Sequence, residues 1–254
     1  MKLRQHISVL MLIARGTIYK ILLIIIAMIL TQTAIFTAVL SQADRILPTY
    51  TSPYPNSIPL DQIFTDSHIE LVLLAAFLGI TALLILNGCD FSSKQGYTLA
   101  RLNITERSVW IWQSVYNTRV YIILLVSELA AIMLMCAIYT RTAEVTGPQT
   151  VMLAFYRSDL LHSILPLAEF SRLARNIILI IALGMTTAYF PYSRRRGRIS
   201  KCGLVLTAAA TVNFIAPTGQ FASDFILILF SLLSAAAALF GIVFEGDEED
   251  EAEN

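Results

Sequence analysis

The residue of this sequence with the clearest chemical potential is Glu128, a carboxylate inside the apolar run Val120–Tyr139. It lies eight residues into that run, about 12 Å from its start at the rise of an α-helix. A charged carboxylate within a bilayer is costly, so Glu128 must be protonated, hydrogen-bonded or turned toward an aqueous cavity. It either lines or gates a pathway, or is a neutral carboxyl bonded to a neighbouring helix.

Other polar residues inside apolar runs are few. Gln32, Ser127 and Asn213 are the possible partners of Glu128. We take Glu128, Asn213 and Gln32 as the candidate pathway-lining residues.

The sequence lacks the patterns that carry catalysis. It has no Gly-x-x-x-x-Gly-Lys-Ser/Thr loop to cradle a phosphate and no His-Glu-x-x-His pair. The spacing of Cys89, Cys136 and Cys202 resembles no metal site. We therefore expect no catalytic residue, metal or cofactor in this chain, and ATP would have to be bound by a different polypeptide.

Long apolar runs surround these residues. The chain is 56% hydrophobic and only 14% charged, whereas a soluble domain carries about 25% charged residues. A run of roughly 20 apolar residues is long enough to cross a bilayer as a helix. Six runs meet or approach that length: Ile21–Leu40, Ile69–Gly88, Val120–Tyr139, Asn176–Tyr192, Cys202–Pro217 and Phe225–Phe244. The sequence thus predicts an all-α, polytopic membrane protein with six transmembrane helices.

The basic residues are distributed unequally between the two sides of these spans. Thirteen of the eighteen Lys and Arg residues lie in segments 1–20, 89–119 and 193–201, on the side of the N-terminus. The positive-inside rule places that side in the cytoplasm. We expect a multi-pass protein of the plasma membrane with both termini cytoplasmic.

The two chain ends differ in character. Met1–Thr17 alternates basic and apolar residues at helical spacing, which predicts an interfacial helix that ends at Gly16; the alternative is an irregular basic flank. Residues 245–254 are too acidic and too poor in apolar residues to fold alone. The predicted organisation is a single six-helix transmembrane domain, 1–244, followed by an acidic disordered tail.

The connector between the second and third spans is longer than a simple link requires. It presents three apolar residues, Tyr97, Leu99 and Leu102, flanked by Lys94 and Arg101. Asn103 or Thr105 can cap the next helix, and Glu106 favours its start. We expect a short cytoplasmic helix whose apolar face is covered by a partner.

The run from Ser93 to Thr105, SKQGYTLARLNIT, resembles the coupling-helix region of the permease subunits of type 2 ABC transporters. The resemblance implies six spans, an amphipathic N-terminal helix and a cytoplasmic coupling helix. It also implies cytoplasmic ATPase subunits that bind ATP and Mg, and a second permease subunit, identical or paralogous. Lys94, Tyr97, Leu99, Arg101 and Leu102 would then contact the ATPase.

The chain departs from that family between the last two spans, where Thr218–Asp224 is much shorter than the usual re-entrant segment. The sequence identifies no substrate. The leading hypothesis is the membrane-spanning subunit of an ABC exporter, and no partner is expected among nucleic acids. The alternative is a non-transporting membrane interaction or immunity protein.

Overall fold

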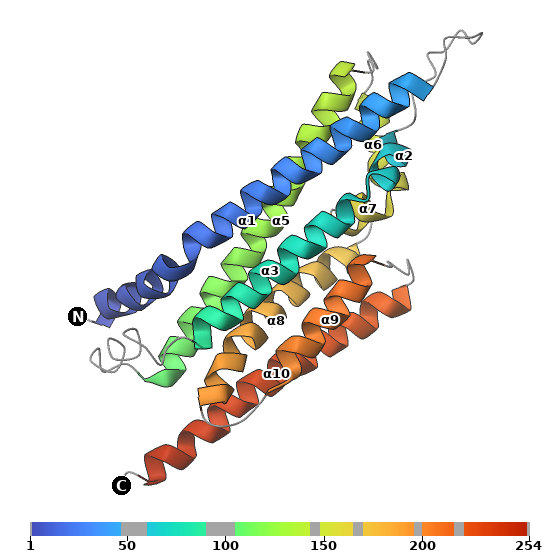
Figure 1. Ribbon diagram of the computed structural model, residues 1–254. Helices are drawn as coiled ribbons and strands as arrows, with labels where there is room; N and C mark the ends of the chain where they lie inside the picture. The colour runs from blue at the N-terminus through green and yellow to red at the C-terminus, as the bar shows by residue number, and fades with distance from the viewer. Residues whose placement is uncertain are drawn as a thin grey trace.

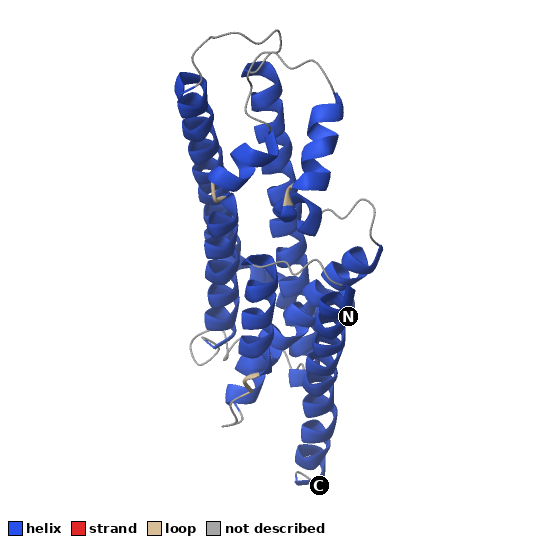
Figure 2. Ribbon diagram, turned by 90° about the vertical axis from the view of Figure 1, so that its right-hand side faces the viewer, coloured by secondary structure: helices blue, strands red, loops and turns tan. Residues whose placement is uncertain are grey.

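The computed structural model describes residues 2–46, 60–89, 105–142, 148–164, 170–195, 200–215 and 221–252. These residues form helices and short turns without a strand (Figure 2). The helices are α1 (Lys2–Ile46), α2 (Leu60–Asp66), α3 (Ile69–Cys89), α5 (Glu106–Thr142), α6 (Pro148–Arg157), α7 (Asp159–Ile164), α8 (Phe170–Arg195), α9 (Cys202–Ile215) and α10 (Phe221–Ala252). The all-α prediction is confirmed.

Five of these helices, α1, α3, α5, α8 and α10, are long and apolar enough to cross a membrane. The remaining predicted span corresponds to α9, which has 14 residues and is about 21 Å long at the rise of an α-helix. That is less than the roughly 30 Å of a bilayer core. The protein is a polytopic membrane protein, and the count of six spans stays a prediction.

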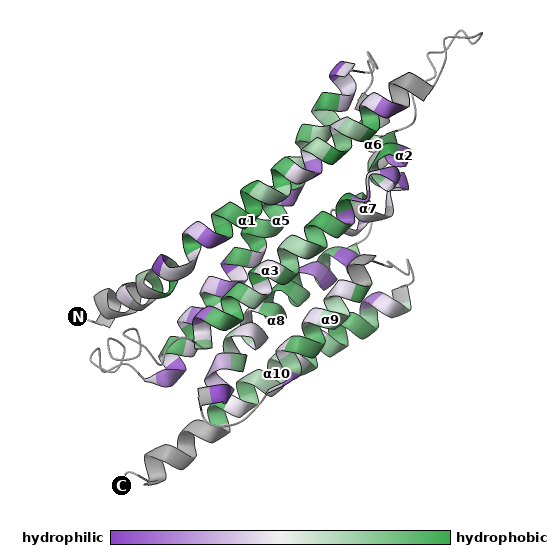
Figure 3. Cartoon of the chain, viewed as in Figure 1, coloured by the Kyte–Doolittle hydropathy of each residue, from purple (hydrophilic) through white to green (hydrophobic). Residues whose placement is uncertain are grey.

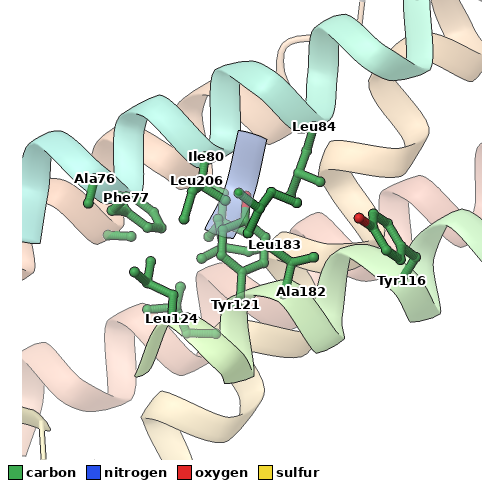
Figure 4. Packing of buried hydrophobic residues seen from close by; sticks show 14 of the residues in the cluster. Ala76, Phe77, Ile80, Leu84, Tyr116, Tyr121, Leu124, Ala182, Leu183 and Leu206 are labelled. Carbon is green, nitrogen blue, oxygen red and sulfur yellow. The ribbon is translucent and has the colours of Figure 1, made fainter. Parts of the chain in front are cut away.

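α1, α3, α5 and α8 alternate in direction along one bundle, α9 returns, and α10 runs parallel to α8, so the start of α1 and the end of α10 lie at the same end (Figure 1). α5 packs against α1 and α8, and α8 also packs against α3, α9 and α10. The main core lies where α1, α3, α5 and α8 meet, and Figure 4 shows part of it around Phe77, Tyr121 and Leu183.

The outer faces of the bundle are apolar over the middle of the long helices (Figure 3). Large exposed hydrophobic side chains on α1 and α10 include Leu22, Leu23, Ile26, Leu30, Phe225, Ile226, Leu229 and Leu232. Apolar surface of this extent would be unfavourable in water and is expected where lipid is the solvent.

At one end of the bundle, α2, α6 and α7 gather against the last turns of α1 and α5 (Figure 1). Phe36, Phe64, Ile132 and Tyr139 are fully buried there in a second apolar cluster. The rings of Phe36 and Phe64 lie 5.3 Å apart. Three short helices of the described chain therefore cover this end of the bundle, which the distribution of Lys and Arg predicts to lie outside the cytoplasm.

The N-terminal segment differs from the prediction, because α1 continues through Gly16 as a single helix of 45 residues. Ile13 and Thr17 are buried against the bundle, and the hydroxyl groups of Thr17 and Tyr116 lie 2.7 Å apart. Packing against α5 thus keeps this segment in line with the first span, where the sequence predicts a separate interfacial helix.

The backbone of α10 stays helical to Ala252, and the disorder of the acidic tail stays a prediction. Glu and Ala are good helix formers, and the preceding span supplies the helical nucleus that an isolated tail would lack. The connector that carries Lys94, Tyr97, Leu99, Arg101 and Leu102 lies outside the described residues.

Candidate functional site

Glu128 and Gln32, two of the three predicted pathway residues, lie in direct contact. The Nε2 of Gln32, on α1, donates to both carboxylate oxygens of Glu128, on α5, at 3.0 and 2.9 Å. Gln32 is 0% exposed and Glu128 is 1% exposed. The Oε1 of Gln32 has no hydrogen-bond partner among the described residues.

The same amide nitrogen shows where Gln32 and Glu128 lie along the bundle, because it is also 3.4 Å from the carbonyl oxygen of Ile69. Ile69 is the first residue of α3, so Glu128 lies beside the start of α3. From this level, α1 and α5 each extend about 21 Å further, at the rise of an α-helix, into the cluster covered by α2, α6 and α7. The carboxylate therefore lies at the junction between the four-helix core and this covered end.

A cavity of about 70 Å³ adjoins the carboxylate. A buried water molecule needs roughly 10 to 15 Å³ of such space, so the cavity has room for several water molecules or a small chemical group. Glu128, Phe77, Tyr121, Leu179 and other residues of α3, α5, α7 and α8 line it. Figure 4 shows Phe77, Tyr121, Leu124 and Leu183 converging from three of these helices.

The cavity walls are mostly apolar, with a few polar groups. Glu70 lies at one side, and its Oε1 is 3.2 Å from Nδ1 of His68. The Tyr121 hydroxyl lies 3.0 Å from that of Thr81. No Lys, Arg or His is found among the described residues that line the cavity.

Asn176 forms the α8 side of the cavity and is held in place on both sides. Its Nδ2 donates to the carbonyl oxygen of Ser163 at 2.8 Å. Its Oδ1 accepts from Nε and Nη2 of Arg175, at 3.2 and 3.0 Å. The Nη1 of Arg175 donates to Oδ1 of Asp224, on α10, at 2.6 Å. The guanidinium group beside Asn176 is therefore already engaged by a carboxylate and an amide.

This arrangement suits binding better than catalysis. A carboxylate in an apolar, enclosed setting attracts a cation or a hydrogen-bond donor. The described lining residues do not include a nucleophile paired with a base, the geometry that acyl or phosphoryl transfer would require. In the described part of the chain, no group of three His, Cys, Asp or Glu residues is arranged to hold a metal ion.

The structure brings together only part of the residues that the sequence singled out. Asn213 belongs to α9, but its side chain is outside the described set. Ser127 donates its hydrogen bond to the carbonyl oxygen of Leu124 in its own helix and not to Glu128. Gln32 is the partner that the structure selects.

Sequence reasoning missed Glu70, Tyr121 and Asn176. Glu70 and Asn176 lie at the starts of the second and fourth predicted spans, and the predicted topology puts both starts on the same side of the membrane. Their similar depth could therefore have indicated that they lie near each other. Nothing in the sequence marks Tyr121.

The chain matches no protein-family model, and no curated protein or solved structure shows significant similarity to it.

Proposed function

We propose that this chain is the membrane-spanning permease subunit of an ATP-driven ABC exporter, coupled to a separate cytoplasmic ATPase. The resemblance of residues 93–105 to a coupling helix and the polytopic helical architecture support this proposal. In this function the ATPase subunits bind ATP and Mg, and a second permease subunit completes the pathway in the plasma membrane.

One structural relationship carries the proposal. Residues 90–104 join the end of α3 at Cys89 to the start of α5 near Glu106. These two helices also supply most of the cavity wall, including Phe77 from α3 and Glu128 from α5. A force applied to the connector would therefore act on two walls of the cavity at once. A coupling helix that transmits ATPase movement needs this connection.

The decisive experiment replaces Leu99 and Leu102 together by Asp. Burial of two or three large apolar side chains contributes several kcal/mol at roughly 1.5–3 kcal/mol each, so two charges in their place should release the partner. The expected result is loss of a co-purifying soluble protein with a Walker motif, and loss of transport coupled to ATP hydrolysis.

A matched control introduces the same two charges at polar positions of the same connector, Ser93→Asp and Gln95→Asp. This variant should keep the ATPase and fold as the parent does. If the Leu99 and Leu102 variant also keeps its ATPase and its full activity, the exporter proposal fails. Absence of any ATPase from purified parent protein would favour the non-transporting interaction protein.

A further inference from the structure

We infer that the cavity beside Glu128 binds the cationic head group of an amphipathic molecule, an alkylammonium, with the Glu128 carboxylate as its counter-ion. This gives the proposed exporter a substrate class and rests on that function for its physiological meaning. Binding itself needs no ATPase and can be measured on the chain alone.

The first argument is the charge of the site. Glu128 is 1% exposed, and within the described chain its hydrogen bonds come only from the Gln32 amide. A neutral amide does not compensate a buried negative charge, so the Glu128 carboxyl is either protonated or paired with a cation, and a cationic ligand would stabilise its charged form. Arg175 does not supply one, because its guanidinium group contacts Asp224 and Asn176.

The second argument is the sign of the other groups around the cavity. Glu70 is the second carboxylate in the wall, and Tyr121 and Asn176 add a hydroxyl and an amide that carry no charge. An anionic head group would meet two carboxylates, and the described lining residues include no cation to offset them. The wall therefore favours a positively charged ligand over an anionic one.

The third argument is the shape and composition of the wall. Phe77 and Tyr121 lie with their ring centroids 5.9 Å apart and their planes inclined at 45°, and both face the cavity. Aromatic faces attract ammonium groups through their quadrupoles. The volume of about 70 Å³ admits a head group and excludes a long chain.

The fourth argument is the route for the apolar part of such a ligand. The cavity is partly open, and Leu74, Leu125 and Ile180 line it while remaining partly exposed. These residues come from α3, α5 and α8. An alkyl chain would extend past them toward apolar surroundings while its ammonium group stays at Glu128.

The test is equilibrium binding of radiolabelled n-decylammonium to the purified chain in phosphatidylcholine nanodiscs, with n-decanol as the uncharged ligand of equal length. Empty nanodiscs measure membrane partition, which is subtracted. Salt of about 0.5 M screens contacts with exposed charges. We expect decylammonium to bind at least about tenfold more tightly than decanol, because a buried charge pair is screened little.

Three variants locate the effect. Glu128→Gln keeps the size and one acceptor oxygen of the side chain but removes the charge, so the two ligands should then bind equally. Asp66→Asn removes an exposed carboxylate that does not line the cavity, and it should keep the parent's preference. Ile180→Trp fills the opening and should weaken both ligands, which tests the site even if Glu128→Gln does not fold.

Equal binding of the two ligands by the parent protein would overturn the inference, because the site would then not distinguish the ammonium group from the hydroxyl. So would a preference that survives Glu128→Gln, or unchanged binding in Ile180→Trp. These outcomes are independent of the connector variant. Release of an ATPase by Leu99→Asp and Leu102→Asp with no decylammonium binding would leave the exporter proposal standing and remove this ligand.

Discussion

The Nη1 of Arg175 lies 2.6 Å from Oδ1 of Asp224, and both side chains are buried. Arg175 is in the second turn of α8 and Asp224 is in the first turn of α10, so these two helices start at the same end of the bundle. The chain must therefore return along the bundle between them, and α9 is the helix that makes this return. Asp224 also lies 3.7 Å from Nε of Arg172 on α8, so ion pairs at this one carboxylate reflect the shared direction of α8 and α10.

Breaking this pair should destabilise the protein strongly. Asp224→Asn leaves a buried guanidinium group without its carboxylate, which typically costs about 3–5 kcal/mol. Thermal unfolding in detergent micelles should show a clear fall in the midpoint. The exposed carboxylate of Asp66 provides the control, because Asp66→Asn makes the same chemical change without a buried partner. Equal midpoints for the two variants would mean that the pair does not hold α8 against α10.

The contact between Gln32 and Glu128 should show strong coupling in a double-mutant cycle. Gln32→Leu removes the only described donor to a buried carboxylate, a loss of about 1–3 kcal/mol or more. Glu128→Leu leaves the Gln32 amide nitrogen with the carbonyl oxygen of Ile69, at 3.4 Å, as its only described acceptor. The double variant removes both polar groups and should be more stable than the sum of the single losses predicts. Strict additivity of the unfolding free energies would show that the two side chains do not interact.

Gly184 should tolerate no side chain, because α5 and α8 approach closely there. A Cβ at Gly184 would lie 2.9 Å from the backbone nitrogen of Thr118 and 3.0 Å from its Cα. Gly184→Ala should therefore cost about 1–3 kcal/mol through overpacking.

Gly79 is the matched control, since a Cβ there meets only the Cδ1 of Ile24 at 3.9 Å. Gly79→Ala should be neutral or stabilising by about 0.5–1 kcal/mol, because Ala is the better helix former. Unfolding midpoints of the two variants provide the comparison, and a Gly184→Ala protein as stable as the parent would contradict the close approach.

The orientation can be tested with two matched substitutions of exposed cations. Arg141 lies near the end of α5, and Lys201 lies just before α9 at the opposite end of the bundle. In a cysteine-free background, Arg141→Cys should react with an impermeant maleimide in intact cells, whereas Lys201→Cys should react only after lysis. The reverse pattern would invert the topology that the distribution of Lys and Arg predicts.

The sequence was sufficient to predict helices in a membrane. The runs around Ile69, Val120 and Phe225 are apolar, and a bilayer offers the backbone no hydrogen-bond partner except its own. The helix start after Thr105 was also predictable, because Thr105 can cap a helix and Glu106 favours its first turn. α5 does begin at Glu106. Gly16 was misleading, because the local pattern indicates a turn there, whereas α1 stays helical through it with Ile13 and Thr17 buried and Thr17 in contact with Tyr116 of α5.

Part of the candidate site was likewise predictable from the sequence, and part depended on the tertiary structure. The sequence alone determined that Glu128 is an acidic residue in an apolar run and needs a partner or a cavity, because an unpaired charge is costly in any apolar surroundings. It left Gln32, Ser127 and Asn213 equally eligible. Only the packing of α1 against α5 brought Gln32 to the carboxylate. Only the contact between α3, α5 and α8 formed the apolar cavity beside it, whose described lining residues include no cation. The physical reason is that helix formation follows from local composition and the solvent, whereas the depth and rotation of each helix follow from side-chain contacts between residues far apart in the chain.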